Sequence, residues 1–235
     1  MYSFQTKFKK TLSDTHTPVE LYLKLRDKFP TSFLLESSDY KSKQNSFSYL
    51  CFHPIASFVV KKETTTLDFP DGTSQVKPTN AVEIASELHQ FTTSFQSEDL
   101  NLGFVTNGLF GYTSYDAIPL FEDIEFKNQS FDLPLMQYHL FRFTIVFNHF
   151  NNELFILENL LPDQKSNLSE LVDLVANRAV TTFHFKKING ETSNFNDEEF
   201  LEKIAIGQQH CFQGDVFQVV LSRKFKQQFQ GDEFN

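Results

Sequence analysis

The chain has 235 residues and a net charge of −9, with 29 phenylalanines and no tryptophan. This length allows one large domain or two small ones, and it can bury a substantial core. The lysines and arginines form no basic stripe, which argues against nucleic acid as a partner. The longest apolar runs fall far short of a membrane span, and the first ten residues lack the apolar core of a signal peptide.

The two cysteines, Cys51 and Cys211, lie far apart in the sequence and fit no metal-ligand spacing. We interpret them as reduced thiols, as in a cytoplasmic protein. The histidines are scattered, and the chain has no phosphate-binding loop and no G-x-S-x-G motif. Composition and periodicity alone therefore predict a cytoplasmic protein without a recognisable catalytic constellation.

The N-terminal third predicts one helix followed by strands. The helix is expected to begin at Pro18, capped by Thr17 in a capping box with Glu20, and to end before Pro30. Short strands are then expected over three segments: 32–37, 47–51 and 55–61. Asp71-Gly72 is a strong hairpin signal between two further strands.

The middle third predicts a second helix, a crowded strand and a hairpin. The helix begins with Asn80 as its cap, and its apolar stripe continues to about residue 97. Three of the chain's eight glycines, Gly103, Gly108 and Gly111, lie within nine residues, which indicates that residues 108–116 form a strand approached closely by other backbone. A hairpin follows, with strands over 134–147 and 153–158, and another helix is expected to begin at Pro162.

The C-terminal third has the weakest pattern over residues 181–195, where we expect the chain to cross between domains. Asn196 caps a last helix, and Gly214 sits where a left-handed helix stop is expected. The run from Val216 to Phe225 is apolar and β-branched, which predicts a strand buried on both faces. Such a strand needs neighbours on its edges. We therefore divide the chain into domains at 1–185 and 186–235, the second being only the beginning of a domain.

Strands dominate, and most connections are hairpin-like. The pattern is α+β rather than alternating βαβ. We expect packed antiparallel sheets with flanking amphipathic helices, incomplete at the C-terminus.

Three phrases in the chain carry a family resemblance: Leu34–Ser37, Gly108–Asp116 and Gly214–Ser222. Together they resemble the large-subunit (component I) family of anthranilate synthases, within the chorismate-utilising enzymes. Phe121–Asp123 and Asp132–Pro134 also look like that family. Each phrase is weak by itself, but their order over nearly the whole chain is specific.

The resemblance implies a reaction and a set of partners. Chorismate would be aminated by ammonia from a glutamine amidotransferase subunit, and pyruvate would be eliminated to leave anthranilate for tryptophan biosynthesis. Mg²⁺ would bind the substrate carboxylate, through ligands expected beyond residue 235. Tryptophan would inhibit by binding to an N-terminal domain, here residues 1–185.

Two candidate sites transfer onto this sequence. The Leu34–Ser37 phrase lines the family's tryptophan site, so Glu36 and Ser37 are candidates for binding the effector's ammonium and carboxylate. The alternative is a polar strand end beside a loop. Gln218 lies where related isochorismate-forming enzymes carry a water-activating lysine. An amide cannot take up a proton there, so Gln218 would form part of the substrate-site wall. Its alternative is an amide bonded to neighbouring backbone.

Several interpretations stay open. A basic residue that the family usually carries before the second strand is replaced here by Asn45, which puts tryptophan sensitivity in doubt. The family's metal carboxylates and catalytic histidine would lie beyond Asn235, so these residues alone are expected to be inactive. Aminodeoxychorismate synthase, a non-catalytic tryptophan-sensing module and one half of a split enzyme remain alternatives.

Overall fold

The computed structural model describes residues 1–37, 46–126, 133–177 and 184–234. The chain forms two compact units, Met1–Val180 and Thr181–Asn235, and each is described by itself. Helices and predominantly antiparallel strands confirm the α+β class. The assignment of an effector domain to 1–185 and a chorismate domain to 186–235 stays a prediction.

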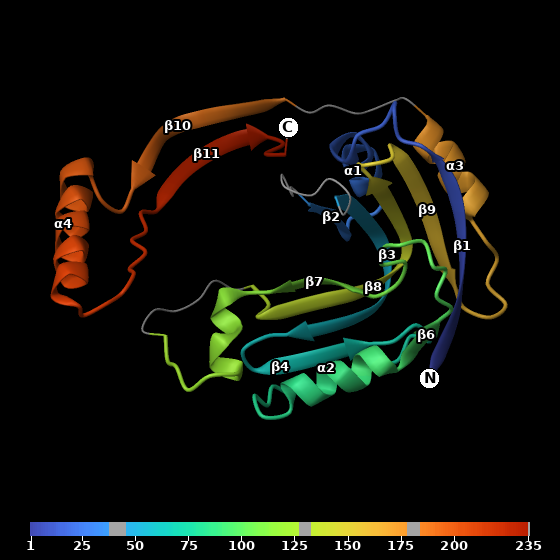
Figure 1. The fold of residues 1–235 in the computed structure, drawn as a ribbon, viewed down its shortest axis with the longest axis horizontal. Coiled ribbons are helices and arrows are strands. Elements are labelled where there is room, and N and C mark those ends of the chain that lie inside the picture. The colour runs from blue at the N-terminus through green and yellow to red at the C-terminus, as the bar shows by residue number, and fades with distance from the viewer. Residues whose placement is uncertain (38–45, 127–132, 178–183, 235) are drawn as a thin grey trace. The chain divides into compact units, whose positions relative to one another are not determined.

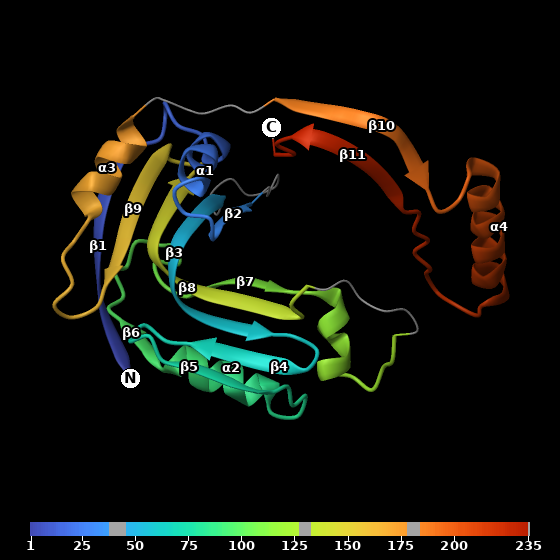
Figure 2. The ribbon, with the colours of Figure 1, turned by 180° about the vertical axis from the view of Figure 1, so that it is seen from behind.

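The first unit is built on a nine-stranded sheet. The order along the sheet is β5-β4-β3-β8-β9-β1-β6, with β2 beside β3 and β7 beside β8; Figure 1 labels these strands except β5, which Figure 2 labels. The strands are β1 (Tyr2–Leu12), β2 (Ser32–Glu36), β3 (Phe47–Val60), β4 (Thr64–Asp68), β5 (Ser74–Pro78), β6 (Phe95–Ser97), β7 (Leu109–Thr113), β8 (Met136–Asn148) and β9 (Glu153–Leu160). Every described pair is antiparallel except β1 with β6.

Helices cover this sheet and close its two main apolar cores. They are α1 (Pro18–Arg26), α2 (Ile84–Thr93), the 3-10 helix η2 (Tyr115–Leu120) and α3 (Leu168–Ala176). α1 and α3 bury leucines against β3, β8 and β9. α2 buries Ile84 and Phe91 in a second core that includes Phe58 of β3, and Figure 2 shows α2 beside β4 and β5. The apolar helical stripes read from the sequence therefore face the sheet as expected.

Two predicted strands, 47–51 and 55–61, are one continuous strand, β3. Separating them was wrong because Pro54, which lacks an N–H, does not end the strand. The pairing with β8 instead shifts register between Pro54 and Ala56, and His53 adopts a φ of 60°. The chain absorbs the proline as a bulge and keeps pairing on both sides of it.

The glycine-rich segment forms β7, and the predicted close backbone approach is confirmed at Gly111. A Cβ atom at this position would lie 1.9 Å from the carbonyl oxygen of Gln137 on β8. The Asp71-Gly72 hairpin and the hairpin joining β8 to β9 are also confirmed.

Two helices differ in extent from the prediction. The helix expected from Pro162 begins only at Leu168, because Asp163 has a φ of 65°, a left-handed conformation that a right-handed helix excludes. The helix expected to begin after Asn80 and to reach residue 97 extends only from Ile84 to Thr93, so Asn80 is not its cap. Phe95 pairs with Tyr2 as part of β6. Phe95 still packs beside the α2 core.

The second unit contains β10 (Phe185–Ser193), α4 (Asp197–Gln213) and β11 (Phe225–Gly231), with β10 and β11 forming a two-stranded sheet. The Asn196 capping box and the left-handed Gly214, with a φ of 80°, are confirmed. The buried strand predicted over 216–225 is wrong. This segment is irregular before β11 begins, because no described strand pairs with its backbone.

Candidate effector and substrate sites

The first candidate site lies at the end of β2. Glu36 is the last residue of this strand and pairs in register with Ser48 of β3. Ser37 follows it, and the Ser46 hydroxyl donates to the Ser37 carbonyl at 3.5 Å. Both Glu36 and Ser37 are exposed. The structure therefore presents both predicted residues to solvent at one strand end.

His149 joins this strand end although it is distant in sequence. The buried Ser48 hydroxyl lies 2.7 Å from Nε2 of the His149 ring. The backbone N–H of His149 donates to the Ser46 carbonyl at 3.1 Å. Because directly paired residues share a sheet face, Glu36, Ser48 and His149 occupy one neighbourhood. No sequence pattern pointed to His149, because only the β3–β8 register brings it here.

Aromatic side chains lie next to the same strand on the other face. Leu35, 37 % exposed, pairs in register with the half-buried Tyr49. The ring of Tyr49 lies 5.5 Å from that of Phe110 on β7. Burial raises the pKa of the Tyr49 hydroxyl, which therefore stays neutral at physiological pH. The strand end thus combines a carboxylate, hydroxyls and an apolar aromatic surface.

The second candidate, Gln218, belongs to the second unit. It is exposed in the irregular segment between α4 and β11. Its neighbours Val219 and Leu221 approach the buried Gly207 of α4, where an added Cβ would lie 3.4 Å and 3.3 Å from them. Gln218 directly precedes Val219, the first of these two contacts. No described hydrogen bond involves its amide, so the alternative of a backbone-bonded amide has no support in the described part of the chain.

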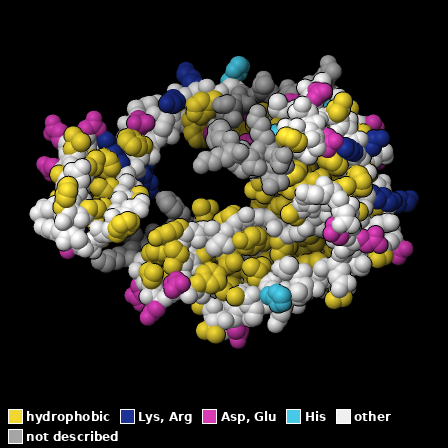
Figure 3. Space-filling view, viewed as in Figure 1, with side chains coloured by type: hydrophobic (Ala, Val, Ile, Leu, Met, Phe, Trp, Pro, Cys, Tyr) yellow, Lys and Arg dark blue, Asp and Glu magenta, His cyan; other side chains and the backbone are white. Residues whose placement is uncertain are grey.

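Large apolar side chains are exposed around Gln218. Phe212, Phe217 and Val220 have exposed fractions of 91 %, 101 % and 83 %, and Figure 3 shows hydrophobic side chains on α4. An apolar surface of this kind is typical of an interaction site. Within the second unit, the predicted substrate wall is therefore accessible from solvent.

The Mg²⁺ ligands that the resemblance implies are expected beyond residue 235, and this stays a prediction that the described part of the chain does not test. No three His, Cys, Asp or Glu side chains in that part of the chain gather as they would to hold a metal ion. Across the same residues, every helix is too short or too polar to cross a membrane.

The sequence model of the chorismate binding enzymes matches residues 31–235. The chain belongs to the chorismate binding enzyme family. This match includes β2, with the effector candidates, and the whole second unit, with Gln218. Family membership therefore covers both candidate sites, although it assigns no role to either.

Curated relatives of this chain include anthranilate synthase component 1 proteins. The protein of Lactococcus lactis is 28 % identical over 246 residues, which cover 97 % of this chain and 50 % of the relative. That of Bacillus subtilis is 26 % identical over 251 residues, covering 94 % and 47 %. The crystal structure of anthranilate synthase component I from Streptococcus pneumoniae superposes with a TM-score of 0.56 at 20 % identity, covering 96 % of this chain and 50 % of that one. The chain thus spans about half the length of the curated relatives it matches.

Proposed function

We propose that these residues are the N-terminal portion of an anthranilate synthase component I. With the remainder of the protein, they would convert chorismate and ammonia to anthranilate and pyruvate for tryptophan biosynthesis in the cytoplasm. Ammonia would come from a glutamine amidotransferase subunit, and Mg²⁺ would hold the substrate carboxylate. The family match over residues 31–235, together with relatives of this name, is the observation that carries the proposal.

We also propose that the 235 residues alone form no product. Gln218 would be one wall of the chorismate site, and its exposure with Phe217 and Val220 supports a site that needs further walls. The test supplies chorismate, ammonium and Mg²⁺ to the chain alone and to a full-length protein containing it. Anthranilate is expected only from the full-length protein. Aminodeoxychorismate, separated by chromatography, would overturn the assignment in favour of the sister enzyme.

Tryptophan is the proposed effector of the β2 strand end. Its ring would lie on Leu35 and Tyr49, and the Ser37 hydroxyl would bind its carboxylate on the same side of the strand. The Glu36 carboxylate, which leaves the opposite face, would reach the ammonium around the strand end. Titration calorimetry with the 235-residue chain tests this directly. Glu36→Gln and Ser37→Ala are each expected to weaken tryptophan binding at least tenfold, because a charge-assisted hydrogen bond contributes about 1.5–3 kcal/mol. Glu63→Gln, an exposed change in another loop, should leave the affinity unchanged.

A non-catalytic tryptophan-binding module is the second candidate function. The compactness of the first unit, which carries both Glu36 and Ser37, favours it. The same experiments distinguish the two functions. Tryptophan binding without anthranilate formation by the full-length protein would support the module. Anthranilate formation with no heat on adding millimolar tryptophan would support an insensitive synthase.

A further inference from the structure

The strand β1 changes partners along its length. Its first residues, Tyr2 to Phe4, pair with β6, but β6 ends at Ser97. From Gln5 to Leu12, β1 pairs only with β9, so its other edge carries no described strand. An uncovered edge offers backbone N–H and C=O groups to an added strand.

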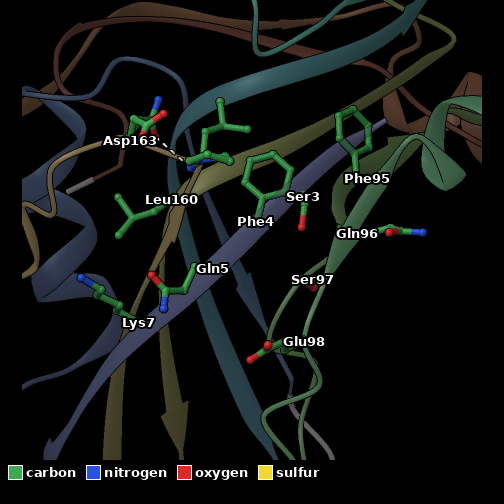
Figure 4. A pocket seen from close by; sticks show the side chains of 13 residues that line it. Ser3, Phe4, Gln5, Lys7, Phe95, Gln96, Ser97, Glu98, Leu160 and Asp163 are labelled. Atoms are coloured by element: carbon green, nitrogen blue, oxygen red, sulfur yellow. Dashed lines mark hydrogen bonds between the residues drawn. The ribbon is translucent and has the colours of Figure 1, made fainter.

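A cleft of about 880 Å³ opens where β6 stops. Its walls are β1 from Ser3 to Lys7, the end of β6 through Glu98, and the turn at 160–164. Figure 4 shows Gln5 and Lys7 projecting from β1, with Ser97 and Glu98 on the neighbouring segment. An extended chain that continues the line of β6 along β1 would place one of its ends in this cleft.

Lysines mark the free edge in an otherwise acidic chain. Lys7 and Lys9 are both exposed, and their spacing of two puts them on one face of the strand. Lys10 forms an ion pair with Glu153 at 2.6 Å, whereas Lys7 and Lys9 form none with a described residue. Lys7 is paired in register with Glu158, but the carboxylate of Glu158 is bound by Arg142, Ser166 and Asn167. Among the residues that the structure describes, these two ammonium groups therefore have no carboxylate partner.

These charges decide what can bind to the edge. A second copy of β1 paired antiparallel would bring lysines against lysines, which disfavours self-association. A strand with acidic side chains at alternate positions would meet both ammonium groups instead. At the cleft, Glu98 and Asp163 would repel an acidic residue, so that end of the occupant must be neutral or basic.

We propose that the free edge of β1, Gln5–Leu12, docks an extended segment of a partner protein. The segment adds to the sheet as a strand, with acidic residues opposite Lys7 and Lys9 and a neutral or basic end in the cleft. This interaction is independent of the proposed tryptophan and substrate sites, because Glu36 and Ser37 lie at the end of β2 and Gln218 lies in the second unit.

The test measures fluorescence anisotropy of a labelled peptide, acetyl-Lys-Thr-Val-Glu-Val-Glu-Val-amide, with the 235-residue chain. Saturable binding is expected at low salt. The double variant Lys7→Glu/Lys9→Glu should weaken it at least tenfold. The matched variant Lys61→Glu/Lys62→Glu, which makes the same charge change at exposed lysines near β4, should leave it unchanged.

Backbone methylation separates strand addition from charge attraction alone. Two peptides of identical charge carry N-methyl groups on alternate residues. In the first peptide the methyl groups lie along one edge of the extended chain, and in the second they lie along the opposite edge. Strand addition requires that only one of them binds, because only one edge donates hydrogen bonds to β1. Equal binding of both, no saturable binding of the unmodified peptide at millimolar concentration, or dimerisation of the chain through β1 in sedimentation experiments would each overturn the proposal.

Discussion

Arg142 of β8 and Glu158 of β9 form an ion pair in which the carboxylate side chain is completely buried, with Nη2 and Oε1 2.8 Å apart. Ser166 and the backbone N–H of Asn167 also donate to this carboxylate, at 2.6 Å and 3.0 Å. Burial by itself would raise the pKa of Glu158, but these hydrogen bonds and the Arg142 charge hold the pKa below its usual range. The pair therefore ties the β8–β9 hairpin to the start of α3.

Replacing Arg142 with methionine should lower the free energy of unfolding by about 3–5 kcal/mol, because the buried carboxylate loses its counter-ion. Urea denaturation of the first unit measures the change. Lys10→Met removes the more exposed Lys10–Glu153 pair from the same sheet and should cost less than about 1 kcal/mol. Equal losses in the two variants would contradict the role assigned to burial.

His139 should make stability depend on pH. Burial lowers its pKa from the usual 6.5, despite an opposing contribution from Asp68. The unfolded chain then binds the proton more tightly, so the contribution of His139 is complete above pH 6.5 and is lost as the pH falls below it.

The variant His139→Phe should flatten this dependence, measured as the free energy of unfolding between pH 5 and 7. The substitution removes Nδ1, which has no hydrogen-bond partner in the described structure. It also removes Nε2, which lies 2.9 Å from the side-chain nitrogen of the partly exposed Gln137. The phenyl ring would join Phe33 and Phe141, whose rings lie 5.5 Å and 5.6 Å from the imidazole. His89→Gln, at an exposed position on α2, should keep the wild-type slope. If the pH dependence of the free energy of unfolding were unchanged in His139→Phe, groups other than His139 would be its cause.

Gly111→Ala should destabilise the first unit by about 3 kcal/mol. The new methyl group would lie 1.9 Å from the Gln137 oxygen and 2.7 Å from the Cα of Tyr138, so β7 would have to move away from β8. Gly190→Ala, where a Cβ meets nothing within 4 Å, should leave the first unit's denaturation midpoint unchanged. A native-like midpoint for Gly111→Ala would show that β7 can shift at little cost.

The two cysteines should differ in reactivity. Burial raises the pKa of Cys51 to about 12, with a smaller opposing effect of its hydrogen bond to Thr144, so almost no reactive thiolate forms at neutral pH. Cys211 is exposed on α4. Iodoacetamide should therefore add once to the native chain, at Cys211, and a second time only after denaturation, as read by intact mass. Cys211→Ser should give no native adduct, and a native adduct on Cys51 would show that β3 opens readily.

Local chemistry made much of the fold predictable. Thr17 and Asn196 accept hydrogen bonds at their helix starts, and Gly214 ends α4, because capping depends on residues only a few positions apart. The Asp71-Gly72 turn follows the same logic. The class of fold was predictable for the same reason, since strand and helix periodicities are local.

Long-range pairing was not predictable from those patterns. Whether Pro54 ends a strand depends on whether β8 continues beside it. The segment 216–225 has a strand-like composition, but a strand also needs a neighbour, and the described chain supplies none. Likewise, Glu36 and Ser37 were candidates from a short phrase, while their proximity to His149 depends on a register between distant strands.

Neighbouring residues were enough to predict the helix caps at Thr17 and Asn196, the turn at Asp71-Gly72 and the α+β class. The tertiary structure alone decided that β1 leaves an open edge beside β6, that Arg142 neutralises a buried Glu158, and that His149 joins the end of β2. A sheet joins segments of any sequence separation through backbone hydrogen bonds, and every residue type except proline can donate them. The side-chain pattern therefore does not show which strands pair.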